Sequence, residues 1–144
     1  MKIYETSHLV KGEDLNHHET LFAARATAWL IEAGFVTASC EHGNADEVVL
    51  RNLHNLSFVK PIKKGAIVKF VSRIVYAGAT SLMVAVQAMD AMTEDIAVEA
   101  FITFVTIEQG SGKKMQHQVV LDEATDEVER ALREKAQHIR SFRE

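Results

Sequence analysis

Apolar residues surround most of the helical cylinder that residues 20–39 would form. This stretch contains no proline and one glycine, Gly34, and many of its residues are good helix formers. A helix that is apolar on nearly every side is buried inside its protein. We therefore predict a central helix that the rest of the chain encloses. Thr20, or otherwise Asn16, is expected to cap its beginning, and Gly34 or Gly43 to mark its end.

Beyond this helix the apolar residues alternate with a period of two, which is typical of half-buried antiparallel strands. A glycine-bearing AGAT at residues 77–80 predicts a hairpin. A short strand is also expected before the helix. The four strands after it are predicted at about 47–59, 66–77, 80–90 and 96–108. In the second of these, one face should carry Val68, Phe70, Ser72, Ile74 and Tyr76, and the other Lys69, Val71, Arg73 and Val75.

One curved antiparallel sheet around the apolar helix accounts for both patterns, and it makes the fold α+β. The free edges of such a sheet favour dimerisation that continues the sheet. Residues 122–143 have an acidic start, a basic end and one apolar stripe, which predicts a trailing amphipathic helix. A chain of 144 residues suits a single domain over residues 1–144, with a core of about 1–108 and a C-terminal helix of about 122–143.

Composition excludes several classes of function. Hydrophobic residues make up 47% and charged residues 25%, as in ordinary soluble proteins, and the net charge of −4 gives no basic footprint for nucleic acid. No apolar run reaches the roughly 18 residues of a membrane span, because Arg25 and Glu32 interrupt the best candidate. The single cysteine, Cys40, leaves no internal disulfide framework. We therefore expect a cytoplasmic protein with no nucleic-acid partner and no membrane insertion.

The stretch Asn16–Gly34, NHHETLFAARATAWLIEAG, brings chemically active residues to the apolar helix. His17 and His18 lack the spacing of helical metal ligands, so no metal site is expected. They belong either to a polar loop or to substrate contact and proton transfer. Arg25 and Glu32 are seven residues apart and share one helical face. That face either looks out of the open side of the sheet or presents Glu32 as a base or nucleophile to a cleft at a dimer seam.

Two stretches carry a resemblance to a known family. NHHETLFAARATAWLIEAG resembles the signature of the hot dog acyl-CoA thioesterases, in which an Asn-x-x-Gly-x-x-(His or Phe)-Gly-Gly run opens the central helix and an acid follows about two turns later. Residues 55–86, NLSFVKPIKKGAIVKFVSRIVYAGATSLMVAV, are similar to the same family's strand, proline-to-glycine turn, strand and hairpin. The resemblance covers approximately residues 7–108 and implies the hot dog fold, a curved antiparallel sheet wrapped around a central helix.

The matches can be followed one position at a time. Asn16 matches the family's asparagine, and Phe22 matches the aromatic or histidine position. Ala23 and Ala24 match the paired glycines. Glu19 falls where a glycine is usual.

The position of the family's acid is a departure. It falls on Ile31, which cannot exchange a proton, and the nearest carboxylate is Glu32, about 100° around the helix. Three interpretations stay open. Glu32 takes the place of that acid; or Glu19, Asp14 and the histidines supply the function; or the protein binds a thioester without cleaving it.

The resemblance implies an acyl-CoA thioester hydrolase that releases a carboxylic acid and coenzyme A. Coenzyme A would enter as part of the substrate, and no separate cofactor is expected. Main-chain N–H groups of Ala23 and Ala24 would stabilise the oxyanion. Glu32 would activate water or attack the carbonyl, and Asn16 would orient water or substrate. The residues expected to hold the coenzyme A part are His18, Lys60, Lys63, Arg73 and Ser81.

The resemblance also implies homodimers that assemble into tetramers or hexamers. Two other functions remain open from the sequence. One is non-catalytic binding of an acyl-CoA or an acyl carrier protein. The other is a hot dog dehydratase, which would act on a 3-hydroxyacyl thioester and release no thiol.

Overall fold

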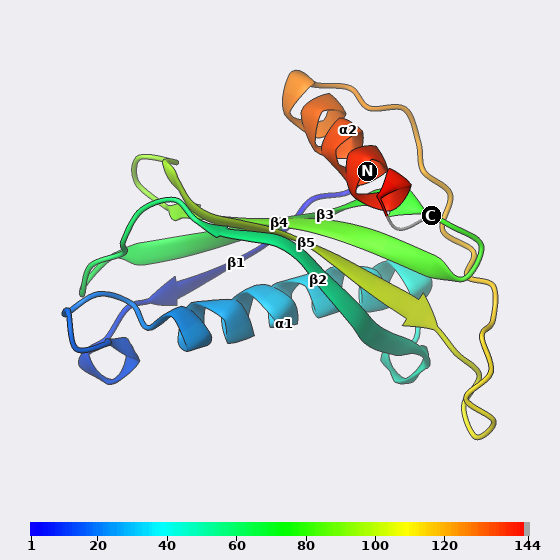
Figure 1. Cartoon of the computed structure of the whole chain (residues 1–144), viewed down its shortest axis with the longest axis horizontal. Coiled ribbons are helices and arrows are strands. Elements are labelled where there is room, and N and C mark those ends of the chain that lie inside the picture. The colour runs from blue at the N-terminus through cyan, green and yellow to red at the C-terminus, as the bar shows by residue number, and fades with distance from the viewer. Residues whose placement is uncertain (143–144) are drawn as a thin grey trace.

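A computed structural model describes residues 1–142 of the chain. A five-stranded antiparallel sheet has the strand order β1-β3-β4-β5-β2. Helix α1 lies along its concave side and α2 crosses the opposite face (Figure 1). In chain order the elements are β1 (Tyr4–Leu9), the 3-10 turn η1 (Gly12–Asp14), α1 (Ala23–His42), the 3-10 turn η2 (Ala45–Glu47), β2 (Val48–Phe58), β3 (Ile67–Ala77), β4 (Ser81–Asp90), β5 (Ile96–Thr106) and α2 (Glu127–Ser141).

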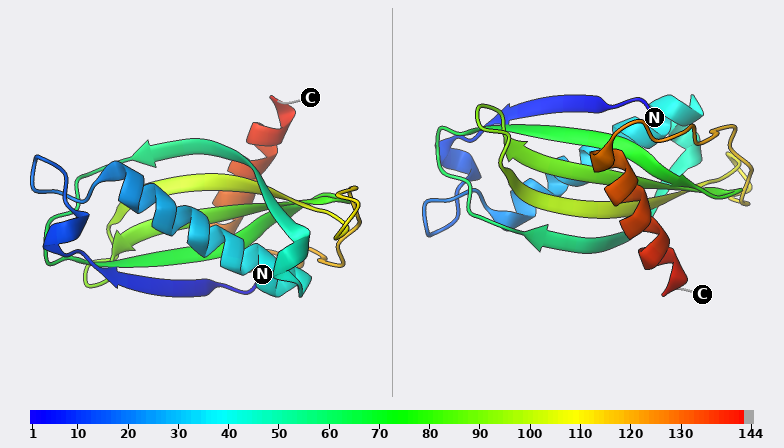
Figure 2. Two further views of the ribbon diagram at one scale, coloured as in Figure 1. Left: turned by 90° about the horizontal axis from the view of Figure 1, so that it is seen from below. Right: turned by 90° about the horizontal axis from the view of Figure 1, so that it is seen from above.

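This is the hot dog fold, so the predicted fold class is confirmed. β1 and β2 are the two edge strands, and the hairpins that join β3, β4 and β5 place these three strands in the middle of the sheet. Figure 2 shows α1 lying across the sheet when the molecule is seen from below, and α2 crossing the sheet when it is seen from above. The sheet therefore carries one helix on each face. Within residues 1–142, no helix is long and apolar enough to cross a membrane.

The period-two alternation of β3 sorts its side chains between the two helices. Val68, Phe70 and Ile74 are buried in the core that contains α1, whereas Val75 belongs to the second core beneath α2. A register shift between Ile74 and Tyr76 interrupts the alternation. Tyr76 consequently packs with the α2 core, so the prediction that it shares the face of Ile74 was wrong.

Helix α1 begins later than predicted and ends at Gly43, one of the two predicted positions. Its N-cap is Phe22, which has no side-chain oxygen to accept a bond, and neither Thr20 nor Asn16 caps it. The helix continues through Gly34 and stops at Gly43, whose φ of 98° is the left-handed conformation that glycine adopts at low cost.

Gly34 allows α1 to lie close to the sheet. A Cβ atom added at this position would sit 2.8 Å from Cδ1 of Ile102 on β5. A side chain here would require the end of the Ile102 side chain or the helix to move, so packing favours glycine at this position.

Helix α1 is enclosed on one side only. Ala26, Leu30, Ala33 and Ala38 are buried against the sheet. A continuous stripe on the other side, which includes Arg25 and Glu32, is exposed at the open side of the sheet. The stripe consists of Ala24, Arg25, Ala28, Glu32, Val36 and Cys40.

Helix α2 is fixed to the outer face of the sheet by apolar and charged contacts. Leu132, Ala136 and Ile139 pack against the sheet. Glu129 is only 3% exposed and lies 3.7 Å from Arg73 of β3 and 2.7 Å from Arg133 of its own helix. The N-terminal amine of Met1 also lies 3.1 Å from this carboxylate, and Asp122 pairs with Arg133 at 3.0 Å, so the buried carboxylate belongs to a network of ion pairs.

Candidate active site

The loop before α1 is held by the side chain of Asn16. Its Oδ1 atom accepts hydrogen bonds from the main-chain N–H groups of His18 at 2.8 Å and Thr20 at 3.2 Å. The Asn16 main-chain N–H donates to the carbonyl of Thr20 at 2.8 Å. Glu19, inside this turn, has a φ of 66°. The left-handed backbone gives the physical reason for the glycine that the resembled family has there.

A second segment fastens the same loop to the sheet. The N–H of Leu21 donates to the carbonyl of Ile62 at 2.7 Å, and Thr20 forms an isolated bridge with Lys63. The connection between β2 and β3 therefore lies against the approach to α1. Lys60, in this connection, is 3.2 Å from Asp95.

The first turn of α1 has unoccupied main-chain donors. Ala23 and Ala24 are both exposed, and neither N–H group donates a hydrogen bond to an acceptor within residues 1–142. The first turn contains no acidic residue. The positive end of the helix dipole is consequently open to a ligand oxygen that carries negative charge.

A buried carboxylate lies beside this helix end. Asp14 is 4% exposed and accepts a hydrogen bond from the main-chain N–H of Lys11 at 2.9 Å. Its Oδ1 atom is 3.4 Å from Nε of Arg25. Its main-chain carbonyl accepts from the N–H of Phe22 at 2.8 Å. These contacts fix Asp14 as part of the support of the helix end and leave the guanidinium of Arg25 partly exposed.

Glu32 is exposed and forms no hydrogen bond or ion pair with any residue of the described part of the chain. It lines a cavity of about 280 Å³ between α1 and β1, together with Trp29 and His8. The rings of His8 and Trp29 are stacked, with centroids 4.2 Å apart and planes 7° apart. The sequence motifs did not single out His8, because its approach to Trp29 depends on how β1 is placed beside the helix.

Tyr4, at the other end of the same cavity, is bonded to α1. Its hydroxyl donates to Oε2 of Glu41 at 2.7 Å. Burial, assisted by this hydrogen bond, raises the pKa of Tyr4 to about 12. The phenol therefore remains protonated at neutral pH and ties β1 to the C-terminal half of the helix.

Ile31, where the resembled family has its acid, is half-buried and packs against the main core. Phe35, one turn later, packs edge-on to Phe104 of β5 at 6.0 Å between ring centroids. Glu32 lies on the exposed side of this pair. An apolar side chain at position 31 therefore suits its surroundings, and the exposed carboxylate of this part of α1 is that of Glu32.

The comparison with protein families decides the family. A model described as the Thioesterase superfamily matches residues 18–97, which include α1 and most of the sheet. The chain belongs to the thioesterase superfamily. No curated protein matches the sequence of this superfamily member.

Solved structures similar to this thioesterase-superfamily chain include enzymes. An acyl-CoA hydrolase from Staphylococcus aureus, in complex with butyryl coenzyme A, coenzyme A and coenzyme A disulfide, is 30% identical, with a TM-score of 0.86 over 98% of this chain and 83% of that chain. A hexameric acyl-CoA thioesterase in the apo form is 26% identical, with a TM-score of 0.85 over 98% of this chain and 90% of that chain. An acyl-CoA hydrolase from Bacillus cereus is 22% identical, with a TM-score of 0.81 over 98% of this chain and 89% of that chain. At this identity the similarity supports the fold alone.

Two residues predicted to hold coenzyme A lie elsewhere in this superfamily member. Arg73 is 6% exposed on the outer face of the sheet, where it faces Glu129 beneath α2. Ser81 begins β4 beside the C-terminal end of β3, whereas the loop before α1 lies against the connection that leads into the start of β3. Its main-chain carbonyl lies 3.0 Å from Nε2 of His117. Within one chain, neither residue is brought to the open helix end, because strand alternation and strand direction carry them away from it.

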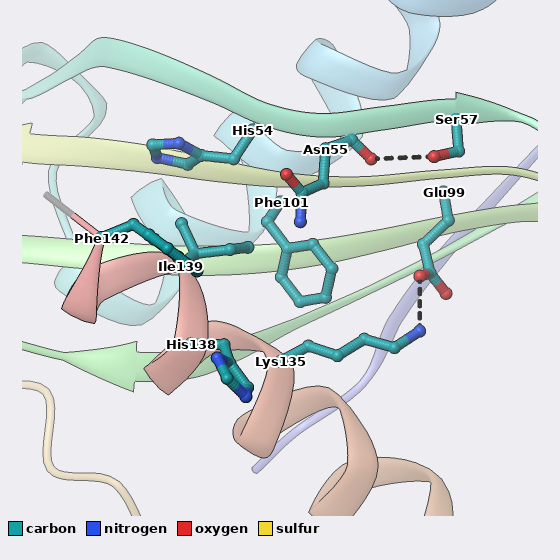
Figure 3. A pocket seen from close by; sticks show the side chains of 9 residues that line it. All are labelled: His54, Asn55, Ser57, Glu99, Phe101, Lys135, His138, Ile139 and Phe142. Carbon is teal, nitrogen blue, oxygen red and sulfur yellow. Dashed lines mark hydrogen bonds and ion pairs between the residues drawn. The ribbon is translucent and has the colours of Figure 1, made fainter.

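The outer face also carries a hollow of about 670 Å³ between α2 and the β2 and β5 strands. Figure 3 shows Phe101 on its floor and the Lys135 side chain reaching across it to Glu99. The Lys135 Nζ to Glu99 Oε1 distance is 3.1 Å. None of the residues predicted for the active site lines this hollow. Within residues 1–142, no group of His, Cys, Asp and Glu side chains is arranged to hold a metal ion.

Proposed function

We propose that this chain is an acyl-CoA thioester hydrolase, which releases a carboxylic acid and coenzyme A. The observation that carries the proposal is the uncapped, exposed N-terminus of α1 in a member of the thioesterase superfamily. The acyl-CoA hydrolase from Staphylococcus aureus, bound to butyryl coenzyme A, supports the same substrate class. We further propose that residues 1–144 act as one domain.

The N–H groups of Ala23 and Ala24 form the oxyanion site in this proposal. They lie at the positive end of the helix dipole, and no side chain of the described residues occupies them. Alanine serves as well as glycine here because the donors belong to the main chain. Asn16 acts by shaping the turn that leads into these donors, since its side-chain oxygen is already bonded within the loop.

A catalytic Glu32 would come from a second copy of the chain. Ala24 and Glu32 are eight residues apart, which is about 12 Å along a helix axis. One chain therefore cannot place both groups on a single carbonyl. In a homodimer, the N–H groups of one copy and Glu32 of the partner subunit can meet the same thioester.

The proposed reaction adds one water to the thioester. Glu32 of the partner subunit takes a proton from water while the water oxygen forms a bond to the carbonyl carbon. The C=O electron pair moves to the oxygen, where the N–H groups of Ala23 and Ala24 stabilise the charge. When this intermediate collapses, the C–S bond breaks, and the leaving thiolate receives the proton from the Glu32 carboxyl. The products are the carboxylic acid and the free thiol of coenzyme A.

The phosphates of coenzyme A require cations near the helix end. The main chain of Lys63 forms an isolated β-bridge with Thr20 beside that end. Lys60 lies in the same connection between β2 and β3, where it pairs with Asp95. His18, in the exposed loop, is a further candidate contact. We retain these three residues for the coenzyme A part of the substrate and leave out Arg73, which is buried against Glu129. Ser81 stays a prediction, because the proposed site lies between two copies of the chain. Dimers that assemble further are supported by the hexameric state of the relative at 26% identity.

An assay of thiol release tests the proposal with a panel of acyl-CoAs of increasing chain length. Glu32→Gln should abolish most turnover while acyl-CoA still binds, because the substitution removes the base and keeps the shape. Glu5→Gln is the matched control, since Glu5 lines the same cavity from β1. Unchanged turnover in Glu32→Gln would exclude Glu32 as the base.

A second function is favoured by one observation, the half-buried Ile31 at the position of the family's acid. A chain that binds acyl-CoA without cleaving it would release no thiol from any substrate. The single tryptophan, Trp29, lies in the α1–β1 cavity, so its fluorescence should report ligands that enter there. Binding without thiol release would establish this alternative.

A further inference from the structure

The α1–β1 cavity has a wall at one end. The cavity has a volume of about 280 Å³, and a second hollow of about 390 Å³ lies beside the first turns of α1, where Arg25 and Asp14 contribute to its lining. Of the residues that the structure describes, only His8 and Trp29 line both spaces. Their rings are stacked, with centroids 4.2 Å apart. The stacked pair therefore stands between the two spaces.

A buried ring holds this wall in place. Phe70 of β3 is 1% exposed and meets both rings edge-on, His8 at 5.6 Å and Trp29 at 6.2 Å between centroids. The backbone of β1 pairs with β3 along its whole length, so His8 is also fixed through its main chain. The wall is therefore part of a cluster of three rings and not a loose side chain.

The other end of the cavity is closed by a hydrogen bond. Tyr4 lines the cavity, and its hydroxyl donates to Oε2 of Glu41 on α1 at 2.7 Å. This bond joins β1 to the helix, as the stack of His8 on Trp29 does nearer the helix N-terminus. The space between the two contacts is therefore bounded along the helix, and it opens to solvent beside Glu32, which is exposed.

The buried part of the lining is apolar. Ala33 of α1 and Phe70 of β3 are both buried. The hydroxyl of Ser72, which is also buried, is bonded to that of Thr37 at 2.7 Å. Among the described residues that line the cavity there is no lysine or arginine. The cavity therefore suits an uncharged hydrocarbon group and not the phosphates of coenzyme A.

We propose that the α1–β1 cavity receives the acyl chain of the substrate, and that the stack of His8 on Trp29 limits the length of that chain. This inference rests on the proposed function in one respect. A thioester beside Glu32, the proposed base, would direct its acyl chain into the cavity that Glu32 lines. A methylene group takes up roughly the 30 Å³ of a water molecule in the liquid, so about nine carbons fill the cavity. Shorter acyl chains fit, and longer ones meet the wall.

Thioethers of coenzyme A test the inference through binding alone, because an S-alkyl group cannot be hydrolysed. A series from S-ethyl to S-hexadecyl is titrated while the fluorescence of Trp29, the single tryptophan, is followed. Each added methylene should lower Kd about threefold to fourfold until about nine carbons are present. Further methylenes should bring no gain, since they find no buried surface. A Kd that keeps falling to the hexadecyl chain would contradict the limit.

Removing the wall should move the limit. In His8→Ala the cavity opens into the second hollow, so chains beyond about nine carbons should bind at least about tenfold more tightly than they do to the wild type, and short chains should bind as before. His8→Phe restores an aromatic ring and should restore the wild-type limit. Leu9→Ala is the matched control, since Leu9 lines the second hollow but not the cavity. A role of His8 in folding alone would weaken the binding of all chain lengths alike.

A variant with the opposite effect guards against loss of folding. Thr6 lies opposite Phe70 in the sheet and lines the cavity from the exposed edge strand, so Thr6→Leu places a larger apolar side chain there. It should move the limit toward shorter chains. Circular dichroism verifies the fold of each variant. A folded His8→Ala variant that keeps the wild-type limit contradicts the wall. If that variant does not fold, an unchanged limit in Thr6→Leu contradicts the assignment of the cavity.

Thiol release separates this inference from the proposed function. If the thioethers bind with the expected limit and the wild type releases no thiol from any acyl-CoA, the assignment of the cavity stands and the enzymatic proposal fails. If the wild type hydrolyses acyl-CoAs while thioether binding shows no limit, or a limit that a folded His8→Ala variant does not change, the enzymatic proposal stands and this inference fails.

Discussion

The two helices pack on opposite faces of one sheet and begin in opposite ways. In α2, the N-cap Asp126 accepts a hydrogen bond from the N–H of Glu129 at 2.8 Å, and the first turn contains acidic residues. In α1, the N-cap is Phe22, and the first turn contains neither a side-chain cap nor an acid. A helix that serves stability has its first donors satisfied. The unsatisfied donors of α1 indicate an end that is kept open for a ligand.

The largest effect is expected where α2 is fixed to the sheet. Glu129→Gln removes the carboxylate that the buried guanidinium of Arg73 faces. It also removes one of the two carboxylates of Arg133, which keeps Asp122 at 3.0 Å. We expect a loss of about 3 kcal/mol of unfolding free energy in denaturant titration. Glu134→Gln, on the exposed side of the same helix, is the control and should be nearly neutral. A loss below about 1 kcal/mol would mean that the ion pairs do not secure α2.

Giving α1 the kind of cap that α2 has should separate stability from activity. Phe22→Asp places an acceptor at the N-cap, so thermal unfolding should show a gain of up to about 1 kcal/mol. The same carboxylate occupies the donors and repels an oxyanion, so kcat/KM for thiol release should fall about 100-fold. Phe22→Leu, apolar and uncapped, is the control. Full activity in a stabilised Phe22→Asp variant would show that the oxyanion is bound elsewhere.

The turn that leads into α1 offers a smaller test. Glu19 adopts a φ of 66°, which costs less for glycine than for other residues. Glu19→Gly should therefore raise the unfolding free energy by about 0.5 kcal/mol, after the greater freedom of glycine in the unfolded chain is counted. His17→Gly, at a position without positive φ, should lower it instead. The opposite ranking would mean that the turn is not strained.

The smallest effect concerns the bond between β1 and α1. The pKa of Tyr4 is raised from its usual 10.0 to about 12, so this group contributes stability that is complete below pH 10 and is lost as the pH rises through 12. In a Tyr76→Phe background, phenolate absorbance should show a single late titration. Glu41→Gln weakens the hydrogen bond and should move that titration toward lower pH. A titration near pH 10 in the unsubstituted background would contradict the buried bond.

The sheet was predictable to within two residues at each end because alternation is a local signal. The strand predicted at 47–59 is Val48–Phe58, and the one predicted at 66–77 is Ile67–Ala77. The start of α1 was not predictable in the same way. Thr20 and Asn16 are good capping residues, but they bond to each other in the loop, and the helix starts only after that loop closes.

The site was predictable in part. The motif located the first turn of α1, because main-chain donors there need no particular side chain. Arg73 was assigned by its charge, and its true surroundings depend on α2, which packs from more than fifty positions away. The stacking of His8 on Trp29 likewise joins a strand and a helix through tertiary packing, which no local pattern records. Contacts between distant segments thus set the limit of what one sequence shows.

Gly34 has a bearing on chemistry far from its own position. The absent side chain lets the helix rest on Ile102 of β5. A methyl group at this position would press against the Ile102 side chain and could tilt α1 relative to the sheet. Ala24 is ten residues away, about 15 Å along the axis, so any tilt of the helix at position 34 would also move the donors there. The packing of Gly34 on β5 therefore helps to fix the direction in which the N-terminus of α1 points.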